Sequence, residues 1–512
     1  MASWVEQLGT FNPQFLRECR GRLKPRSVLA TVGLSLIAQI LLYLAIMDNS
    51  YQSREQSWLN LAQTLSWLMP YALFVIGGFF IVDDLAREEK RGTLNFIRLS
   101  PRPAREILSG KLMGAPLLPI LLVVTAVPLH VYASIATNRV SPLWLVSYYA
   151  LLIVGSGLVF SLALLFGLVG SGSSLAKQQT LAAVAFAGLA LVVITPLFMW
   201  LNSDVTWNGF GQLSPFFNPY GLASAQYDQQ IYWLGLPLST NALVGSLFAI
   251  GNLLIGTVLT WQVLLRKFRI PSATLLSKRV SYVLVAYVNV VIWGFLQTTK
   301  TGSLNDRLSG AAGWYVINAG LFLALVFALA PSRQMLLDWL RYRRTSLSDW
   351  IWNDSSPSIL AVAINFIIAI ALIVPWALIV DFGDEPLPIG RLLLATLSVA
   401  TLSLIYATLV QLIYSMRLRM ASIWAVGIVA TIIFVPWIVI GILNPSGSRA
   451  PIEIAIWTFI GAPIWSDIDT NITLGIAMGL MMQVVVLLLL LTRLARNLQQ
   501  LSKRQATSLT RV

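Results

Sequence analysis

The sequence predicts an all-α membrane protein that crosses the bilayer about twelve times and carries further amphipathic helices on its cytoplasmic side. Of its 512 residues, 57% are hydrophobic and only 11% are charged, whereas soluble domains contain about 25% charged residues. The apolar residues gather in runs of about 17 to 25, the length that spans a bilayer as a helix. Composition and run length together therefore place the chain in a membrane.

The apolar runs form two sets of six, which predict a first transmembrane half at 27–270 and a more divergent second half at 271–492. The twelve expected spans are 27–47, 63–82, 114–136, 143–169, 179–200, 241–265, 280–297, 313–330, 357–380, 389–414, 421–443 and 472–492. Residues 1–26 are expected to form an interfacial helix, and residues 493–512 a basic cytoplasmic tail. In both sets a charged segment follows the second span, which suggests two halves of the same orientation.

Topology explains the net charge of +14. With a cytoplasmic N-terminus, 29 of the 35 Lys and Arg residues lie inside and six outside, as the positive-inside rule predicts. We therefore expect the protein to lie in the plasma (inner) membrane with both termini in the cytoplasm. The positive charge does not require a nucleic-acid partner, and we expect none. One cysteine, Cys19, and one histidine, His130, offer no internal disulfide and no metal site, so no cofactor is expected.

The charged segment 83–113 holds the candidate functional residues. Gly92 frees the backbone after a mixed-charge turn, and Thr93 is a candidate N-cap of a short amphipathic helix. The turn at 100–103 ends that helix, because proline disfavours a helical conformation in the residue before it. A second helix is expected from about Pro103. On charge alone, the segment could either bind a cytoplasmic partner or lie on anionic lipid headgroups.

The stretch EEKRGTL at 88–94, followed by LSPRPAREILSGKL, resembles the signature of ABC type-2 exporter permeases. NPQFLRECRGRLKPR at 12–26 is similar to the interfacial connecting helix of that family. The resemblance covers about residues 12–270 and implies that segment 83–113 contains a coupling helix, which docks on a separate ATPase subunit. Carried over by position, it assigns docking to Glu89, Arg91, Gly92, Thr93, Leu94, Glu106, Gly110 and Lys111, to which we add the neighbouring Glu88 and Ile97.

The second half departs from this signature. Residues 331–352 occupy the corresponding segment but lack the Gly-Thr pair and the proline turn, and they predict an interfacial helix that either lies on lipid or docks a partner. The chain contains no Gly-x-x-x-x-Gly-Lys-Ser/Thr loop, so ATP and Mg²⁺ would be bound by the partner subunit. The chain is therefore expected to be a permease rather than an enzyme.

Two other functions fit the same topology. An ion-coupled secondary transporter would need an ionisable residue within its spans. No predicted span has Asp, Glu, Lys or Arg near its centre. We interpret His130 as a packed or interfacial histidine rather than a proton relay. A non-transporting membrane scaffold would need no such group. The external segments 201–240 and 444–471 are expected to lie at the membrane interface rather than to contact a substrate. The apolar spans do not identify a substrate, and either one chain or a homodimer could form the path.

Overall fold

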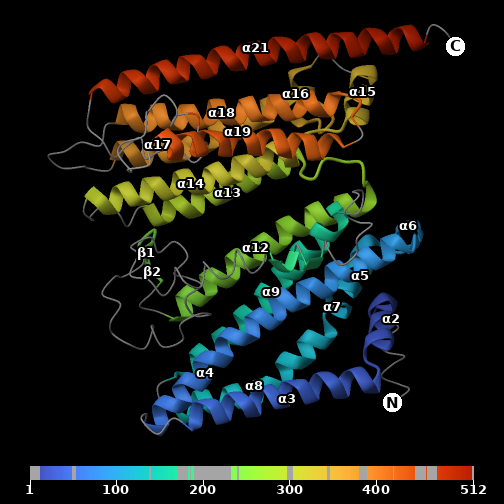
Figure 1. The fold of residues 1–512 in the computed structure, drawn as a ribbon, viewed down its shortest axis with the longest axis vertical. Helices are drawn as coiled ribbons and strands as arrows, with labels where there is room; N and C mark the ends of the chain where they lie inside the picture. Colours follow the sequence, from blue (N-terminus) through green and yellow to red (C-terminus); the bar gives the residue numbers. More distant parts are fainter. Residues whose placement is uncertain are drawn as a thin grey trace. The chain divides into compact units, whose positions relative to one another are not determined.

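The computed structural model describes most of the chain and divides into two compact units, unit 1 (Met1–Pro271) and unit 2 (Ser272–Val512) (Figure 1). The described residues are 12–48, 53–137, 140–170, 183–184, 186–188, 232–238, 242–296, 304–342, 346–379, 389–418, 420–443, 457 and 470–509. These residues are helical apart from turns, short links and one hairpin, in which β1 (Tyr232–Trp233) pairs antiparallel with β2 (Leu236–Pro237).

Eight helices among the described residues are long and apolar enough to cross a bilayer. This confirms the prediction of a helical protein embedded in a membrane. The predicted span at 313–330 appears as a helix that bends by 66° into Arg333–Arg341, and two more predicted spans contain the shorter apolar helices Ile359–Pro375 and Ala421–Pro436. Most of 179–200 and of both external segments lies outside the described residues, so the number of twelve spans stays a prediction.

Unit 1 consists of a short amphipathic helix followed by long apolar helices with two short helices between them. In chain order these are α2 (Pro13–Arg22), α3 (Pro25–Met47), α4 (Arg54–Tyr71), the π-helix η1 (Ala72–Gly77), α5 (Gly78–Lys90), α6 (Thr93–Arg98), α7 (Ala104–Gly114), α8 (Leu117–Ala136), α9 (Pro142–Gly170) and α12 (Ala242–Arg269). Figure 1 shows α4 and α5 as one rod with α6 at its end. The predicted second helix of the charged segment is confirmed as α7, whose N-cap is Pro103.

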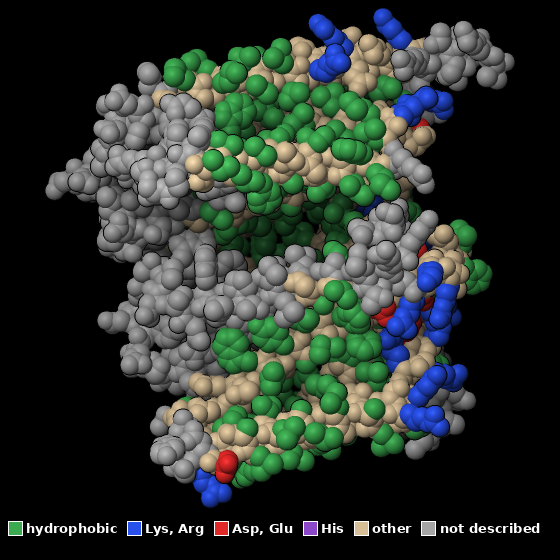
Figure 2. Space-filling model, viewed as in Figure 1, with side chains coloured by type: hydrophobic (Ala, Val, Ile, Leu, Met, Phe, Trp, Pro, Cys, Tyr) green, Lys and Arg blue, Asp and Glu red, His purple; other side chains and the backbone are tan. Residues whose placement is uncertain are grey.

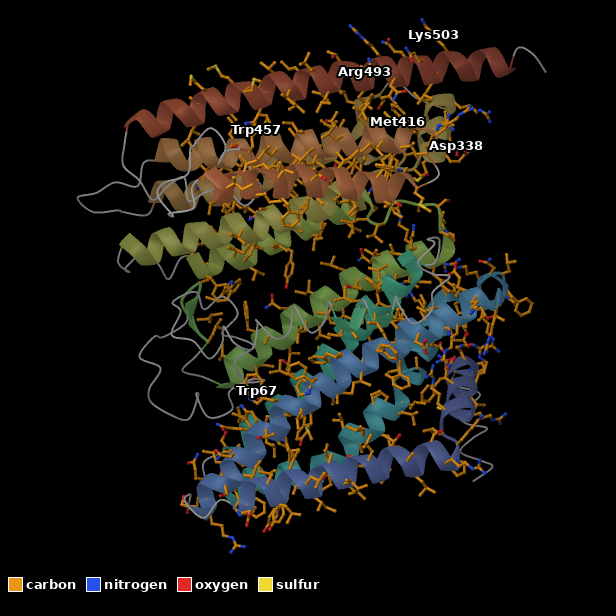
Figure 3. The ribbon with its side chains drawn as sticks, in the orientation of Figure 1. Trp67, Asp338, Met416, Trp457, Arg493 and Lys503 are labelled. Atoms are coloured by element: carbon orange, nitrogen blue, oxygen red, sulfur yellow. The ribbon has the colours of Figure 1, made fainter. Side chains whose placement is uncertain are left out.

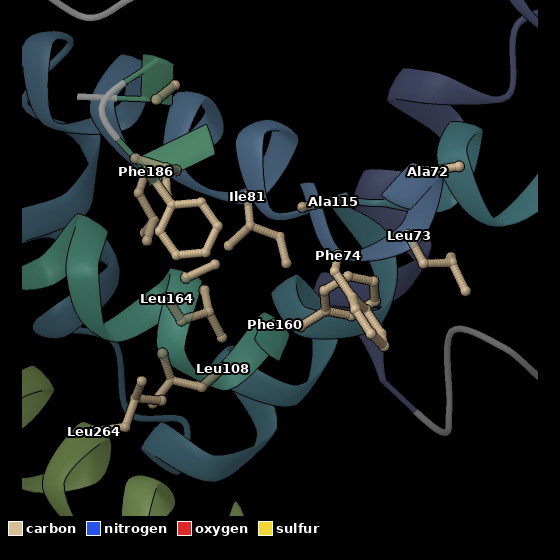
Figure 4. Close-up of a cluster of buried hydrophobic side chains, with 14 of the residues drawn as sticks. Ala72, Leu73, Phe74, Ile81, Leu108, Ala115, Phe160, Leu164, Phe186 and Leu264 are labelled. Atoms are coloured by element: carbon tan, nitrogen blue, oxygen red, sulfur yellow. The ribbon is translucent and has the colours of Figure 1, made fainter. Parts of the chain in front are cut away.

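The core of unit 1 joins this rod to the neighbouring helices. Buried apolar side chains of α5, α7, α9 and α12 form one cluster, in which Ile81, Leu108, Leu164 and Leu264 are labelled in Figure 4. The buried Leu94 of α6 belongs to the same cluster. The base of the charged segment is therefore continuous with the transmembrane core.

Unit 2 is arranged around one enclosed helix. Its helices are α13 (Lys278–Leu296), α14 (Leu304–Ala328), α15 (Arg333–Tyr342), α16 (Leu347–Trp352), α17 (Ile359–Ile379), α18 (Ile389–Ser415), α19 (Ala421–Leu443) and α21 (Thr470–Leu509). Helix α18 packs against α14, α17, α19 and α21. Amide and hydroxyl side chains join α18 to α21 at both ends: Gln483 Nε2 donates to Ser398 Oγ (3.1 Å), and Asn497 Nδ2 donates to Ser415 Oγ (2.8 Å). Arg493 and Lys503 are exposed on the C-terminal part of α21 (Figure 3).

A buried lysine fixes the short helix α16 to the start of α13. Lys278 Nζ donates to Trp350 O (2.8 Å), Ser356 Oγ (2.6 Å) and Pro357 O (3.2 Å). Its backbone N–H donates to Asp354 Oδ1 (2.8 Å). Three acceptors match the three protons of the ammonium group, so every donor of this buried side chain is satisfied.

We expect Lys278→Met to destabilise unit 2. The substitution leaves buried acceptors without a donor, which costs about 1–3 kcal/mol for each group that finds no new partner. Thermal unfolding of the detergent-purified protein, followed by circular dichroism, should show a lower Tm. Lys24→Met, at an exposed lysine, is the control and should change the free energy of unfolding by less than about 0.5 kcal/mol. Equal effects from both variants would contradict this role for Lys278.

Candidate functional site

The candidate site lies at the end of unit 1 where α2, α6, α7 and the last turns of α5 meet, and Lys and Arg side chains gather there (Figure 2). Its centre is Lys111, whose side chain is 0% exposed. The ammonium nitrogen lies 2.7 Å from Asp84 Oδ2, 2.7 Å from Glu88 Oε2 and 3.7 Å from Glu18 Oε1. One lysine of α7 therefore joins two carboxylates of α5 to one of α2.

Two arginines of α2 complete this arrangement. Arg22 Nη2 lies 2.7 Å from Asp84 Oδ1, and Arg17 forms an ion pair with Glu88. We call Arg17, Glu18, Arg22, Asp84, Glu88 and Lys111 the ion cluster. Three cations face three carboxylates in it, so its formal charges balance. Removing any one partner would leave an uncompensated charge, and that cost is several kcal/mol where the site is buried.

The electrostatics of the ion cluster keep Lys111 charged. Burial by itself would lower the pKa of Lys111, but the carboxylates of Asp84, Glu88 and Glu18 outweigh it and raise that pKa above its ordinary value of 10.5. A group whose pKa is raised by folding stabilises the folded state fully below its unfolded pKa, and this stabilisation disappears only as the pH rises through the folded pKa. Loss of the Lys111 charge therefore needs a pH above 10.5.

The three carboxylates of the ion cluster are also the one group among the described residues with the spacing of a metal site. Glu18, Asp84 and Glu88 place ligand oxygens within 4.8 Å of one another. The Lys111 ammonium lies among them, so it is the cation that these carboxylates hold.

Close packing of α2 on α7 brings the ion cluster together. A Cβ atom on Gly110 would lie 2.7 Å from Asn12 Oδ1 and 2.8 Å from Phe15 N, and one on Gly114 would overlap the Glu18 side chain. Two glycines four residues apart thus let the helices touch, as in small-xxx-small packing. Asn12 adds a hydrogen bond from its Nδ2 to Glu106 O (2.8 Å).

A left-handed glycine turns the chain between α5 and α6. Gly92 has φ = 72° and occupies the N-cap position of α6, a conformation that favours glycine. The prediction that Thr93 is the N-cap is therefore wrong. Thr93 is the first residue of the helix, and its Oγ1 donates back to Glu88 O (3.1 Å).

Helix α6 has two different apolar faces. Leu94 and Ile97 are buried against unit 1, whereas Phe96 is 78% exposed and Leu99, at the C-cap, is 86% exposed. Arg98 lies between these faces, with its Cζ 5.8 Å from the ring centre of Phe268 at the end of α12. Burial lowers the pKa of Arg98, which the charge of Glu89 opposes. The inner face holds α6 in place, and the outer face is open.

The structure divides the ten residues that the sequence assigned to docking. Glu88, Leu94, Ile97, Gly110 and Lys111 are buried, Glu89 and Glu106 are half-buried, and Arg91, Gly92 and Thr93 are exposed. Whether any of them contacts a partner stays a prediction. In this structure the buried ones pack inside unit 1 rather than present a surface.

Sequence reasoning missed the outer face and most of the ion cluster. It predicted a short amphipathic helix without dividing its apolar residues, although the spacing of Leu94, Phe96, Ile97 and Leu99 separates them into the pairs 94/97 and 96/99, each three residues apart. That spacing is a signal in the sequence. No comparable signal links Arg17, Glu18 and Arg22 to Asp84.

The segment of unit 2 that corresponds to α6 forms two helices rather than the one expected. Leu336 and Trp339 of α15 are buried, and Trp339 Nε1 donates to Asp349 Oδ2 of α16 (2.6 Å). Leu347 at the start of α16 is 79% exposed.

A comparison with known protein families, curated proteins and solved structures found no match to the chain.

We expect Lys111→Met to disrupt the candidate site. Three carboxylates would then lose their shared cation, and loss of one partner of a buried ion pair costs about 3–5 kcal/mol. The measurement is the Tm of the purified protein, together with protection of the α2 and α7 amides from hydrogen exchange. Lys90→Met is the matched control, since Lys90 is an exposed lysine of the same segment. Unchanged protection in the Lys111 variant would show that the ion cluster does not hold these helices.

Proposed function

We propose that this chain is the permease subunit of an ATP-driven exporter and that it docks a separate ATPase subunit through α6. The observation that supports the proposal is the outer face of α6, where Phe96 and Leu99 are exposed on a helix whose inner face is fixed. Two large apolar side chains on a short, well-held helix form a compact hot spot for a partner. ATP and Mg²⁺ are bound by the ATPase, and this chain contributes no catalytic group.

In this proposal the ion cluster converts docking into movement of the spans. We call α2, α6, α7 and residues 83–90 of α5 the clamped body. The ion cluster and the glycine contacts hold α2, α5 and α7 together, and the bond from Thr93 to Glu88 O with the buried Leu94 and Ile97 attaches α6. A force applied to α6 is then carried by all of these elements. Helices α3 and α8 follow α2 and α7 directly in the chain, so they receive the displacement. Rigid-body motion of this kind is a common form of switching.

The charges around the outer face of α6 indicate the chemistry of the partner. Lys90, Arg91, Arg102 and Arg105 are exposed on the same segment. We therefore propose that the ATPase receives α6 in a groove with an apolar floor and an acidic margin.

In the same proposal the protein lies in the inner membrane with both termini in the cytoplasm, and α15 and α16 lie at the lipid surface. Either one chain or a homodimer forms the path.

We expect Phe96→Asp and Leu99→Asp to weaken ATPase association without unfolding the protein, because both side chains are exposed. Loss of a hot-spot residue costs about 2 kcal/mol or more, which is about 30-fold in affinity. The measurement is the amount of ATPase subunit that co-purifies with the tagged chain from its native membrane, identified by mass spectrometry and by ATP hydrolysis.

Leu347→Asp provides the matched control, as an equally exposed leucine on a short helix of unit 2. It should leave association unchanged. A loss with this variant as well would show that α16 also docks the ATPase, contrary to its placement at lipid. If no ATPase co-purifies with the wild-type chain, the proposal fails and a membrane scaffold becomes the better description.

A second candidate function, ion-coupled transport, would require an ionisable group inside the spans, and His130 is the residue to test. The side chain is fully buried, and both ring nitrogens are hydrogen bonded: Nε2 lies 2.8 Å from Ser66 Oγ, and Nδ1 lies 2.7 Å from Tyr149 OH. Ser66 Oγ donates its only proton to Ala62 O (2.8 Å). Each ring nitrogen of His130 therefore has a hydroxyl partner. An ionisable group inside the spans is a default candidate for proton transfer.

We expect His130 to be structural, and His130→Gln tests this. Proteoliposomes that contain the chain alone and a trapped pH indicator are given a K⁺ diffusion potential. An ATP-driven exporter should show no His130-dependent proton entry. Proton entry that occurs with the wild type and disappears with His130→Gln would favour ion coupling instead. Addition of a protonophore to the His130→Gln vesicles is the control, and it should restore proton entry.

A further inference from the structure

The guanidinium group of Arg98, the last residue of α6, has an edge that binds no acceptor. Its Nη1 donates to Asn95 Oδ1 (3.3 Å). Its Nε and Nη2 are closed off from solvent, and neither is hydrogen bonded to a residue that the structure describes. Buried donors in proteins are nearly always hydrogen bonded, and a charged donor without an acceptor is especially unfavourable. Arg98 therefore has unused capacity to bind an acceptor.

The unused edge of Arg98 has the geometry of an anion site. Nε and Nη2 are the two parallel donors on one side of the planar group, and such a fork matches two oxygens of a carboxylate or a phosphate. Glu89 is the carboxylate whose charge acts on Arg98. The structure shows no hydrogen bond or ion pair between these two described residues. The fork is thus not used by the neighbouring carboxylate.

Further cations lie beside this edge at the end of α12. The Cζ atom of Arg98 lies 5.8 Å from the ring centre of Phe268, which is buried. Lys267 lies close enough to Arg98 and Arg266 to be repelled by both. Three cations and the carboxylate of Glu89 leave an excess of positive charge between α6 and α12. A bound anion would balance this excess.

Capping of helix ends explains one of these cations but not Arg98. Basic side chains near a helix C-terminus commonly bind its last carbonyl groups. Lys267 does so, since its Nζ donates to Pro271 O just beyond α12 (2.6 Å). Arg98 also lies in the last turn of its helix, but its printed side-chain bond goes to the side chain of Asn95. The fork of Arg98 is therefore left for another acceptor.

The depth of the site in the membrane suggests which anion reaches it. Residues Leu243–Arg269 form a helix long and apolar enough to cross a bilayer, and Phe268 lies in its last turn. The end of this helix is predicted to be cytoplasmic, and lipid phosphates lie at the ends of spans. Anionic lipids of the cytoplasmic leaflet attract basic residues at that level.

We infer that Arg98, with Arg266 and Lys267 beside it, forms a binding site for a phosphate group between α6 and the end of α12. The Nε–Nη2 fork donates to two phosphate oxygens, and the neighbouring cations balance the negative charge. The phosphate belongs either to the headgroup of an anionic phospholipid or to a phosphate ion in solution. The site does not include Phe96 or Leu99, so it does not depend on an ATPase partner.

The test measures binding of both phosphate sources to the detergent-purified full-length protein. Native mass spectrometry counts the phosphatidylglycerol molecules that the protein retains during a lipid titration, with phosphatidylcholine as the reference lipid. Inorganic phosphate is tested by the increase in Tm that a bound anion produces, against sodium chloride at equal ionic strength. We expect the wild type to retain phosphatidylglycerol in preference to phosphatidylcholine.

Arg98→Gln removes both the fork and its charge. It should weaken phosphatidylglycerol binding about ten-fold or more, which is the size of one charge-assisted hydrogen bond. Arg98→Lys keeps the charge without the fork and should weaken binding less. Arg493→Met, at an exposed arginine of α21, is the control and should bind like the wild type. The Tm of each variant without added lipid shows whether it is folded.

An increase in Tm with inorganic phosphate that Arg98→Gln abolishes, without preferential retention of phosphatidylglycerol, would assign the site to a phosphate ion in solution. The inference is overturned if the wild type responds to neither phosphate source. This outcome needs the wild-type chain alone, so it is decisive even if the Arg98 variants do not fold. Equal binding by wild type and Arg98→Gln, or equal losses in Arg98→Gln and Arg493→Met, would also overturn it.

Discussion

The contact between the Lys111 ammonium and three carboxylates is the interaction on which the rest of unit 1 depends. An isolated buried lysine would be strongly unfavourable, and so would three buried carboxylates close together. Each makes the other acceptable, with Arg17 and Arg22 balancing the remaining charge. Because the partners come from α2, α5 and α7, the cost of breaking one contact falls on all three helices. The placement of α6 follows, since Gly92 and the bond from Thr93 to Glu88 O attach it to the same end of α5.

Unit 2 solves the same packing problem with different chemistry. Lys278 is as deeply buried as Lys111, but its ammonium donates to carbonyl and hydroxyl oxygens instead of to carboxylates. Neutral acceptors stabilise a positive charge less strongly than carboxylates do. The three acceptors around Lys278 nevertheless equal the three protons of its ammonium group in number. Each unit thus has a six-residue helix near one buried lysine. Lys278 bonds α16 directly, whereas Lys111 pairs with Glu88, the residue whose carbonyl accepts from Thr93 of α6. The stretch of unit 1 that resembles a family signature contains Glu88, Gly110 and Lys111 of this arrangement, whereas the buried lysine of unit 2 is held by neutral oxygens.

The sequence predicted what local pattern determines. Apolar runs gave helices such as α3 and α8, and the proline at 103 gave the start of α7, because helix formation and termination depend on neighbouring residues. It did not predict the ion cluster, since Arg22 and Asp84 are 62 residues apart, and Arg17 and Glu88 are 71 apart. Such pairs are set by the packing of α2 on α7. The π-helix was missed for a similar reason: Pro70 indicates a disturbance, but the Tyr148 hydroxyl that makes it tolerable comes from another helix.

In the proposed function, a push on α6 reaches the spans only through the ion cluster. If the ion cluster were weak, that push would only bend the link at Gly92, and the spans would not respond. The contacts along the second span divide by chemistry: the ion pairs of Asp84 and Glu88 lie at its end, and apolar, glycine-lined contacts lie along its middle. Directional bonds are therefore concentrated where α2, α5 and α7 meet, beside the point at which α6 leaves α5.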